Sequence, residues 1–225
     1  MKDLKAIIFD LDGVIVDTAK YHFIAWRKLA NDLGFDFDEH DNEKLKGVSR
    51  VESLNLILKM GNVSKTEEEK TMLAAHKNDH YQSLIAGMNV SEILPGALEL
   101  LKEIKNTDIY CVLGSASKNA RRILEYVGLF DYFDEIVDGT NVSKAKPDPE
   151  VFTVGADALG IDYDSVVVIE DSLAGIQAAN TAGMFSIGIG DEMILNAADW
   201  VIPSLENIHL SDIQSRFFNK NLEDN

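Results

Sequence analysis

The sequence KAIIFDLDGV at residues 5–14 decides the fold of this chain. It contains an uninterrupted apolar run, residues 6–9, that leads directly into two aspartates. An apolar run this short, without helical periodicity, predicts a strand buried on both faces of a sheet. Similar runs recur further along the chain, at 109–113, 166–169 and 185–189.

Helical patterns lie between these runs. Apolar residues repeat at helical spacing after Pro95-Gly96 and again before Gly128. A further helix is expected to start at Asp148-Pro149, with the aspartate as N-cap and the proline at the first helical position, and another covers 172–182. Strands that alternate with helices predict an α/β fold, a parallel sheet covered by helices on both faces.

Residues 18–92 interrupt this alternation. Three helical patterns occur there, and no stretch has the pattern of a strand; the patterns cover 18–33, 50–60 and 65–85. We therefore predict an all-helical cap domain, residues 16–92, inserted into a core domain made of 1–15 and 93–225.

The composition restricts the possible partners. The 225 residues include 38 acidic and 21 basic side chains, a net charge of −17, so we expect neither nucleic acid nor an anionic membrane as a partner. An anionic substrate would need a local group of cations or a metal ion. The single cysteine cannot form an internal disulfide, and no signal peptide or long apolar span is evident, so we expect a cytoplasmic protein.

Two acids follow the first predicted strand. Asp10 and Asp12 are placed where open α/β sheets bind their ligands, at the carboxyl end of a strand. Two neighbouring carboxylates can act as a nucleophile and a general acid/base, because each raises the pKa of the other. The alternative is an ordinary polar turn, since aspartate and glycine are common turn residues.

Three later segments carry complementary groups. Gly114-Ser115-Ala116-Ser117 offers hydroxyl and backbone N–H groups that suit a phosphate, and Lys146 offers a cation. Glu170-Asp171 adds hard oxygen ligands of the kind that Mg²⁺ prefers. Each segment alone is also explained by helix capping or by a solvated lysine. Their occurrence in one sequence favours a shared site.

The motifs DLDGV, GSAS, KAKPDP and IEDSLAGIQAANTAGM together resemble those of the haloacid dehalogenase superfamily. The resemblance implies a Rossmann-like core and Mg²⁺-dependent phosphoryl transfer through an aspartyl phosphate. It makes Asp10 the nucleophile and Asp12 the general acid/base. Ser115 and Lys146 would hold the transferring phosphate. The Mg²⁺ ligands would be Glu170, Asp171, the Asp10 side chain and the Asp12 carbonyl.

Within that superfamily, the segments KGVSR at 46–50 and SKN at 117–119 resemble those of the sugar phosphomutases. The resemblance implies a second, distal phosphate site made of Arg50, Ser117, Lys118 and Asn119. His22 would couple closure of the cap to the action of Asp12, with Lys77 beside it and Thr18 at the hinge. The remaining substrate contacts would come from Trp26, Lys46, Gly47 and Ala116.

The expected reaction is the interconversion of β-D-glucose 1-phosphate and glucose 6-phosphate by a monomeric isomerase, with β-glucose 1,6-bisphosphate as phosphoryl donor. Asp12 argues against a dehalogenase, which has no leaving oxygen to protonate. A phosphatase of sugar monophosphates and a non-catalytic phosphate-binding protein stay open as alternatives. Arg121 and Arg122 depart from the family pattern and are expected to lie close to the distal site.

Overall fold

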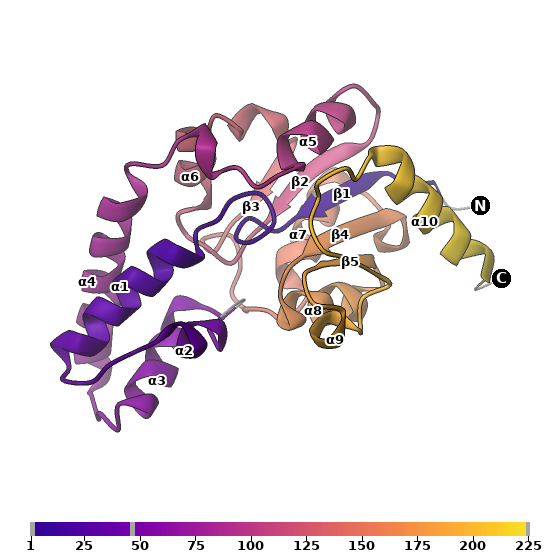
Figure 1. Ribbon diagram of the computed structural model, residues 1–225. Coiled ribbons are helices and arrows are strands. Elements are labelled where there is room, and N and C mark those ends of the chain that lie inside the picture. Colours follow the sequence, from indigo (N-terminus) through magenta and orange to yellow (C-terminus); the bar gives the residue numbers. More distant parts are fainter. Residues whose placement is uncertain (1–2, 46–47, 224–225) are drawn as a thin grey trace.

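The computed structural model describes residues 3–45 and 48–223. Within these residues, six parallel strands form one sheet in the order β3-β2-β1-β4-β5-β6 (Figure 1). Ile8 of the central strand pairs with Val112 on one side and with Val168 on the other. The strands are β1 (Ala6–Phe9), β2 (Tyr110–Gly114), β3 (Glu135–Val137), β4 (Val166–Glu170), β5 (Phe185–Ile189) and β6 (Trp200–Ile202).

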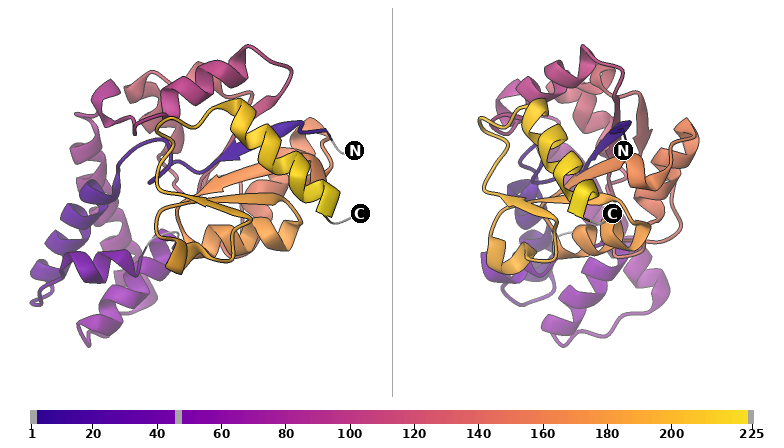
Figure 2. Two further views of the ribbon diagram at one scale, coloured as in Figure 1. Left: turned by 45° about the vertical axis from the view of Figure 1, so that its right-hand side comes forward. Right: turned by 90° about the vertical axis from the view of Figure 1, so that its right-hand side faces the viewer.

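Helices cover both faces of this sheet, and a further group of helices lies beyond its edge (Figures 1 and 2). The α-helices of the described segments are α1 (Ala19–Asp32), α2 (Glu39–Glu43), α3 (Arg50–Met60), α4 (Glu67–Ile85), α5 (Ala97–Lys105), α6 (Ala120–Val127), α7 (Glu150–Leu159), α8 (Leu173–Ala182), α9 (Glu192–Leu195) and α10 (Leu210–Glu223). Short 3-10 turns occupy Val90–Glu92, Phe130–Tyr132 and Tyr163–Ser165.

Alternate residues of β1 serve two separate hydrophobic clusters. Ile7 and Phe9 pack on the face that α5, α6 and α10 cover, whereas Ala6 and Ile8 pack on the face that α7 and α8 cover. All four side chains are fully buried. This two-sided burial is the reason that the strand reads as a continuous apolar run rather than an alternating one.

The predicted α/β fold is therefore confirmed, with differences in detail. The expected strand 185–189 and the expected helix 50–60 have the predicted bounds. Strands β3 and β6 and helices α2, α9 and α10 were not predicted; each of the two strands has only three residues, too few to show a pattern. Pro149 is the N-cap of α7 rather than its first helical residue, and Asp148 Oδ1 accepts the N–H of Glu150 at 3.1 Å.

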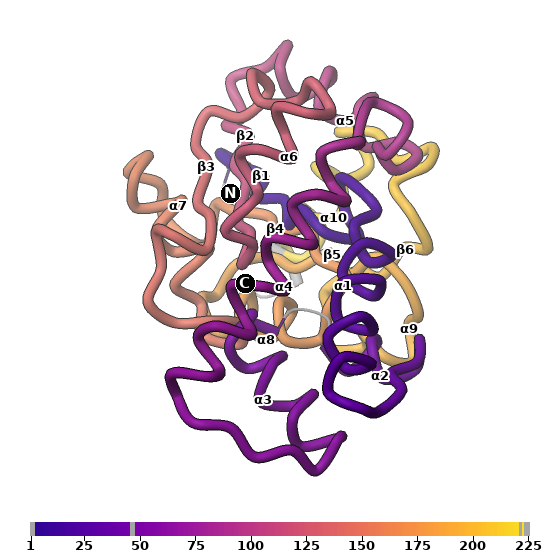
Figure 3. The backbone as a smooth tube through the Cα atoms, turned by 90° about the vertical axis from the view of Figure 1, so that its left-hand side faces the viewer, coloured from indigo at the N-terminus to yellow at the C-terminus, as the bar shows by residue number. Residues whose placement is uncertain are grey.

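Helices α1–α4 lie between β1 and β2 in the sequence and stand beyond the strand ends, in front of the sheet in Figure 3. They have a hydrophobic cluster of their own, in which Trp26, Leu54 and Ile57 are buried. The chain passes between the sheet and these helices twice. The two connecting segments lie side by side, and Val16 of one forms an antiparallel bridge with Ile93 of the other. In the described part of the chain, no helix is both long and apolar enough to span a membrane.

Candidate active site

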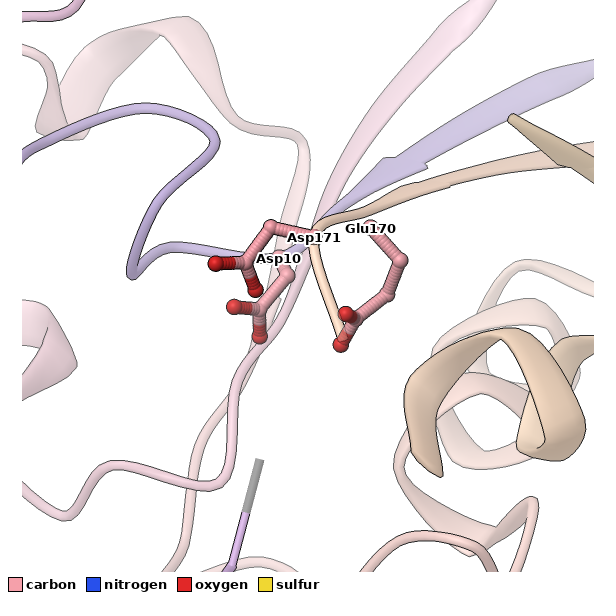
Figure 4. A group of neighbouring side chains, drawn as sticks. All are labelled: Asp10, Glu170 and Asp171. Atoms are coloured by element: carbon pink, nitrogen blue, oxygen red, sulfur yellow. The ribbon is translucent and has the colours of Figure 1, made fainter. Parts of the chain in front are cut away.

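Three carboxylates meet at the carboxyl edge of the sheet. Asp10 follows β1, Glu170 ends β4, and Asp171 is the next residue (Figure 4). One oxygen from each of them lies within 4.8 Å of the others. Because β1 and β4 are hydrogen-bonded neighbours, their ends bring together acids that are 160 positions apart in the sequence.

Lys146 lies between two of these acids. Its ammonium donates to Asp10 Oδ1 at 2.7 Å and also forms an ion pair with Glu170, and its side chain is 2% exposed. The second oxygen of Glu170 accepts from the backbone N–H of Ser172 at 2.7 Å and from its hydroxyl at 2.8 Å. Both oxygens of Glu170 are thus held by hydrogen bonds, which fixes the orientation of the carboxylate.

Two glycines make room for the acids. A Cβ on Gly175 would lie 2.0 Å from Glu170 Cδ, so the first turn of α8 accepts the folded-back glutamate only without a side chain there. Gly13 has a φ of +79°, and a Cβ on it would lie 2.1 Å from Asp171 Oδ2. The positive φ and the close approach both favour glycine at this position.

The donor set of the cluster fits a magnesium ion. Asp10 and Glu170 share the ammonium group of Lys146, and a carboxylate oxygen of Asp171 lies near both acids. Hard oxygen ligands of this kind are those that Mg²⁺ prefers. Burial raises the pKa of Asp10 to about 7, and the charges of Glu170 and Asp12 add to this effect while Lys146 opposes it. A divalent cation would favour the ionised form of Asp10 and so oppose the effect of burial on its pKa.

Asp12 is held between the nucleophile candidate and the cap. Its backbone N–H donates to Asp10 Oδ2 at 3.1 Å, and its carboxylate accepts from the buried hydroxyl of Thr18. Burial raises the pKa of Asp12, and the hydrogen bond from Thr18 opposes that rise. A carboxyl group with a raised pKa can donate a proton as well as accept one, as a general acid/base requires.

The loop after β2 forms a chain of hydrogen bonds beside Asp10. The fully buried Ser115 accepts from the N–H of Ser117 at 3.1 Å, and the Ser117 hydroxyl accepts from the N–H of Asn119 at 3.3 Å. The backbone of Ala116 lies close to Gly139, since a Cβ added to Gly139 would lie 2.3 Å from the Ala116 carbonyl oxygen. Since β2 is the other neighbour of β1, this loop faces the same edge as the acids.

The predicted residues of this loop do not all behave alike. Lys118 is exposed, as a ligand of an incoming anion can be. The side-chain amide of Asn119 is instead hydrogen-bonded to Gln82 and to Asn78 of α4. The side chain of Arg121 pairs with Asp138 at 3.3 Å and donates to the carbonyl of Ile136 in β3. Its guanidinium group is thus held by protein acceptors, and its expected place near the distal site stays a prediction.

The cap brings three predicted residues together. Lys77 Nζ lies 2.9 Å from His22 Nδ1 and 4.2 Å from the centroid of the Trp26 ring, and Lys77 is 3% exposed. Burial lowers the pKa of Lys77 well below its usual range, with help from the charge of Arg50. Burial likewise lowers the pKa of His22, and the charge of Lys77 adds to this effect. Lys46 and Gly47 lie outside the described residues.

One residue of this group was missed in the sequence. Tyr81 is 1% exposed and its ring lies 4.2 Å from that of His22, centroid to centroid. It follows Lys77 by four positions, so both side chains lie on the same face of α4. That spacing is the signal that would have identified it.

Arg50, the first residue of α3, is half-buried, and burial lowers its pKa.

Comparisons with known proteins agree with this geometry. A family model described as haloacid dehalogenase-like hydrolase matches residues 4–183. The chain is 43% identical over 209 residues to a β-phosphoglucomutase of Bacillus subtilis, covering 92% of each protein. It is 30% identical over 184 residues to a phosphorylated carbohydrates phosphatase of Thermotoga maritima, covering 80% of this chain and 82% of that protein. A crystal structure of β-phosphoglucomutase from Clostridium difficile superposes with a TM-score of 0.94 at 44% identity, covering 97% of this chain and 99% of that one.

Proposed function

Since this chain belongs to the haloacid dehalogenase-like hydrolase family, we propose that it is a phosphomutase that interconverts β-D-glucose 1-phosphate and glucose 6-phosphate. The observation that carries the proposal is the pair that the buried Lys77 forms with the half-buried His22 in the cap. Lys77 lies close enough to Asp12 for its charge to oppose the rise of the Asp12 pKa. A basic group of the cap thus acts on the same carboxylate that would move the proton of a sugar hydroxyl.

In this proposal, Asp10 carries the phosphoryl group and Asp12 moves the proton. Asp12 takes the proton of the 6-hydroxyl of β-glucose 1-phosphate while the phosphoryl group passes from Asp10 to that oxygen. The product, β-glucose 1,6-bisphosphate, then presents its 1-phosphate. Asp10 attacks that phosphorus, Asp12 returns the proton to the leaving oxygen, and glucose 6-phosphate departs.

The buried cation of the core would bind the transferring group. Lys146, whose ammonium lies 2.7 Å from Asp10, and the buried Ser115 would hold phosphoryl oxygens next to Asp10. A magnesium ion held by Asp10, Glu170, Asp171 and the Asp12 carbonyl would neutralise the charge of the phosphoryl group against that of the attacking carboxylate. Charge neutralisation at preorganised groups is the main way in which enzymes accelerate phosphoryl transfer.

A second phosphate site distinguishes a mutase from a phosphatase. A mutase must hold a bisphosphate at both ends and keep water away from the aspartyl phosphate, whereas a phosphatase needs one phosphate site only. We assign the distal phosphate to Arg50, Ser117 and Lys118, and the exclusion of water to residues 16–92, acting as a cap. The exposed Lys118 and the half-buried Arg50 are available for such a ligand.

The test follows two products from β-glucose 1-phosphate with Mg²⁺ and a trace of glucose 1,6-bisphosphate. A coupled dehydrogenase measures glucose 6-phosphate, and a colorimetric assay measures free phosphate in parallel. The proposal predicts rapid formation of glucose 6-phosphate with little free phosphate. Free phosphate in excess of glucose 6-phosphate would identify a sugar-phosphate phosphatase instead.

A further inference from the structure

The side chain of Asn119 joins the core to the cap. Its Oδ1 accepts from Gln82 Nε2 at 3.0 Å, and its Nδ2 donates to Asn78 Oδ1 at 3.2 Å. Asn119 itself is 7% exposed. Gln82 and Asn78 are four positions apart on α4, so their side chains lie on one face of the helix. One of them bonds to the oxygen and the other to the nitrogen of the Asn119 amide.

This arrangement is not the ordinary use of an asparagine at such a position. Asn119 is the N-cap of α6, where a side chain usually accepts a backbone N–H of the first turn, yet its side chain makes no capping hydrogen bond. The amide is turned toward α4 instead. The side chain of Asn119 therefore connects the core to the cap and does not cap α6.

The connection continues into the phosphate loop. The N–H of Asn119 donates to Ser117, whose own N–H donates to Ser115. A continuous row of hydrogen bonds therefore runs from the loop that would hold the phosphate to the cap helix. The loop and the cap are thus linked by these hydrogen bonds as well as by the two chain crossings that Figure 1 shows.

The adjacent face of α4 carries the groups that act on Asp12. Lys77 precedes Asn78 in the chain, Tyr81 precedes Gln82, and these two neighbours contact His22. Positions 77–82 span fewer than two turns of α4, a helix of 19 residues, and its backbone hydrogen bonds fix their places relative to one another. The hydrogen bonds of Asn78 and Gln82 to Asn119 therefore help to determine where Lys77, and the His22 ring that it contacts, lie relative to Asp12.

We propose that Asn78 and Gln82 are positioning residues that direct the phosphoryl group of Asp10 to the sugar hydroxyl rather than to water. They do so by holding α4 against the phosphate loop through Asn119. This inference rests on the proposed phosphomutase function. Neither residue touches the reacting atoms, so their loss changes the fate of the aspartyl phosphate and leaves its formation intact.

The test replaces both amides by apolar side chains of similar size, Asn78→Leu and Gln82→Met, singly and together. Ser83→Ala is the matched control, since Ser83 is exposed on the same helix and its hydroxyl donates only to the carbonyl of His80. We expect the ratio of free phosphate to glucose 6-phosphate to rise about tenfold in the double variant, while hydrolysis of p-nitrophenyl phosphate stays within about twofold of the parent rate.

A double-mutant cycle separates positioning from general destabilisation. If the bridge acts through Asn119, Gln82→Met changes the product ratio in the parent protein and has no further effect in the Asn119→Ala background. Equal losses of both products, or the same effect of Gln82→Met in both backgrounds, would overturn the proposal.

A second readout keeps this proposal separate from the phosphomutase function. If the parent protein makes no glucose 6-phosphate, that function is refuted. Amide hydrogen exchange then tests separately whether Asn78 and Gln82 hold α4 against the phosphate loop through Asn119. The double variant should exchange faster than Ser83→Ala at the first turn of α6 and in residues 115–119. Equal exchange in the two variants would overturn the bridge.

Discussion

The ammonium group of Lys146 lies 2.7 Å from the carboxylate of Asp10 while it also pairs with Glu170, so one buried cation joins the ends of β1 and β4. Burial alone would lower the pKa of Lys146, but the two carboxylates raise it above its usual value. The lysine therefore remains charged at neutral pH. It keeps the acids together and leaves a cation next to the proposed nucleophile.

Replacing Asp10 by asparagine should abolish phosphoryl transfer. Asp10→Asn keeps the shape of the side chain and removes the nucleophilic oxygen, so we expect activity to fall by at least about a thousandfold. Formation of glucose 6-phosphate and hydrolysis of p-nitrophenyl phosphate should fall together. Measurable full turnover by this variant would contradict the assignment of Asp10, and an unchanged circular dichroism spectrum would show that the variant is folded.

Arg50 is expected to matter for the bisphosphate more than for a simple ester. Arg50→Ala should lower the rate of glucose 6-phosphate formation about a hundredfold and change hydrolysis of p-nitrophenyl phosphate by no more than about twofold. Arg27→Ala is the control, because Arg27 is an exposed arginine of the cap that pairs with Asp36. Similar losses in both reactions would argue against a distal phosphate at Arg50.

Gly175 is predicted to be required for the metal site. The Cβ of Gly175→Ala would displace Glu170, so we expect the affinity for Mg²⁺ to fall about tenfold. Isothermal titration calorimetry with the metal alone measures this effect. The control is Gly87→Ala, whose Cβ would meet only a carbonyl at 3.9 Å. An affinity equal to that of the control would show that Glu170 is not a ligand.

Binding of Mg²⁺ should depend on pH through Asp10. The folded-state pKa of Asp10 is raised to about 7, above its usual value of 3.8, so the metal-free folded protein binds an extra proton between these values. The metal-free protein therefore loses stability as the pH rises through about 7. The metal competes with that proton, so stabilisation by Mg²⁺ should be larger near pH 8 than near pH 5.5.

Thermal unfolding with Mg²⁺ or with EDTA at both pH values checks this prediction. Asp10→Asn is the matched variant, because it removes the titrating group and should flatten the pH dependence of the metal-free protein. A stabilisation by Mg²⁺ that is the same at both pH values would be inconsistent with a proton on Asp10.

The docking of α10 should weaken as the pH rises. His209 Nδ1 lies 2.7 Å from a carboxylate oxygen of Glu103 on α5, and this hydrogen bond raises the pKa of His209. The stabilisation is complete below the unfolded pKa of the histidine and is lost as the pH rises through the folded one. Removing the histidine should therefore lower the melting temperature more at about pH 6 than at about pH 8.

The measurement compares His209→Ala with His76→Ala, an exposed histidine of α4. Only the former should show the pH-dependent loss. The same loss of melting temperature at both pH values would indicate that His209 acts by packing alone.

Much of the core could be predicted because its information is local. Asp10 and Glu170 each follow a buried apolar run, and strand ends in a parallel sheet meet at one edge. The role of Asn119 could not be predicted in this way, because its partners are 37 and 41 positions away and depend on the angle at which α4 meets the core. The partners of Arg121 could not be predicted for a related reason: they are Ile136 in β3 and Asp138 directly after it, and β3 is a strand too short to recognise.

The central claim is that the phosphoryl group of Asp10 passes to a sugar hydroxyl, and its most direct test follows that group through one turnover. The protein is phosphorylated with ³²P-labelled acetyl phosphate, mixed with β-glucose 1-phosphate and quenched with acid. The account predicts that most of the label appears first in glucose 1,6-bisphosphate, while free phosphate forms slowly. Release of the label as free phosphate at the same rate with and without the sugar phosphate would contradict it.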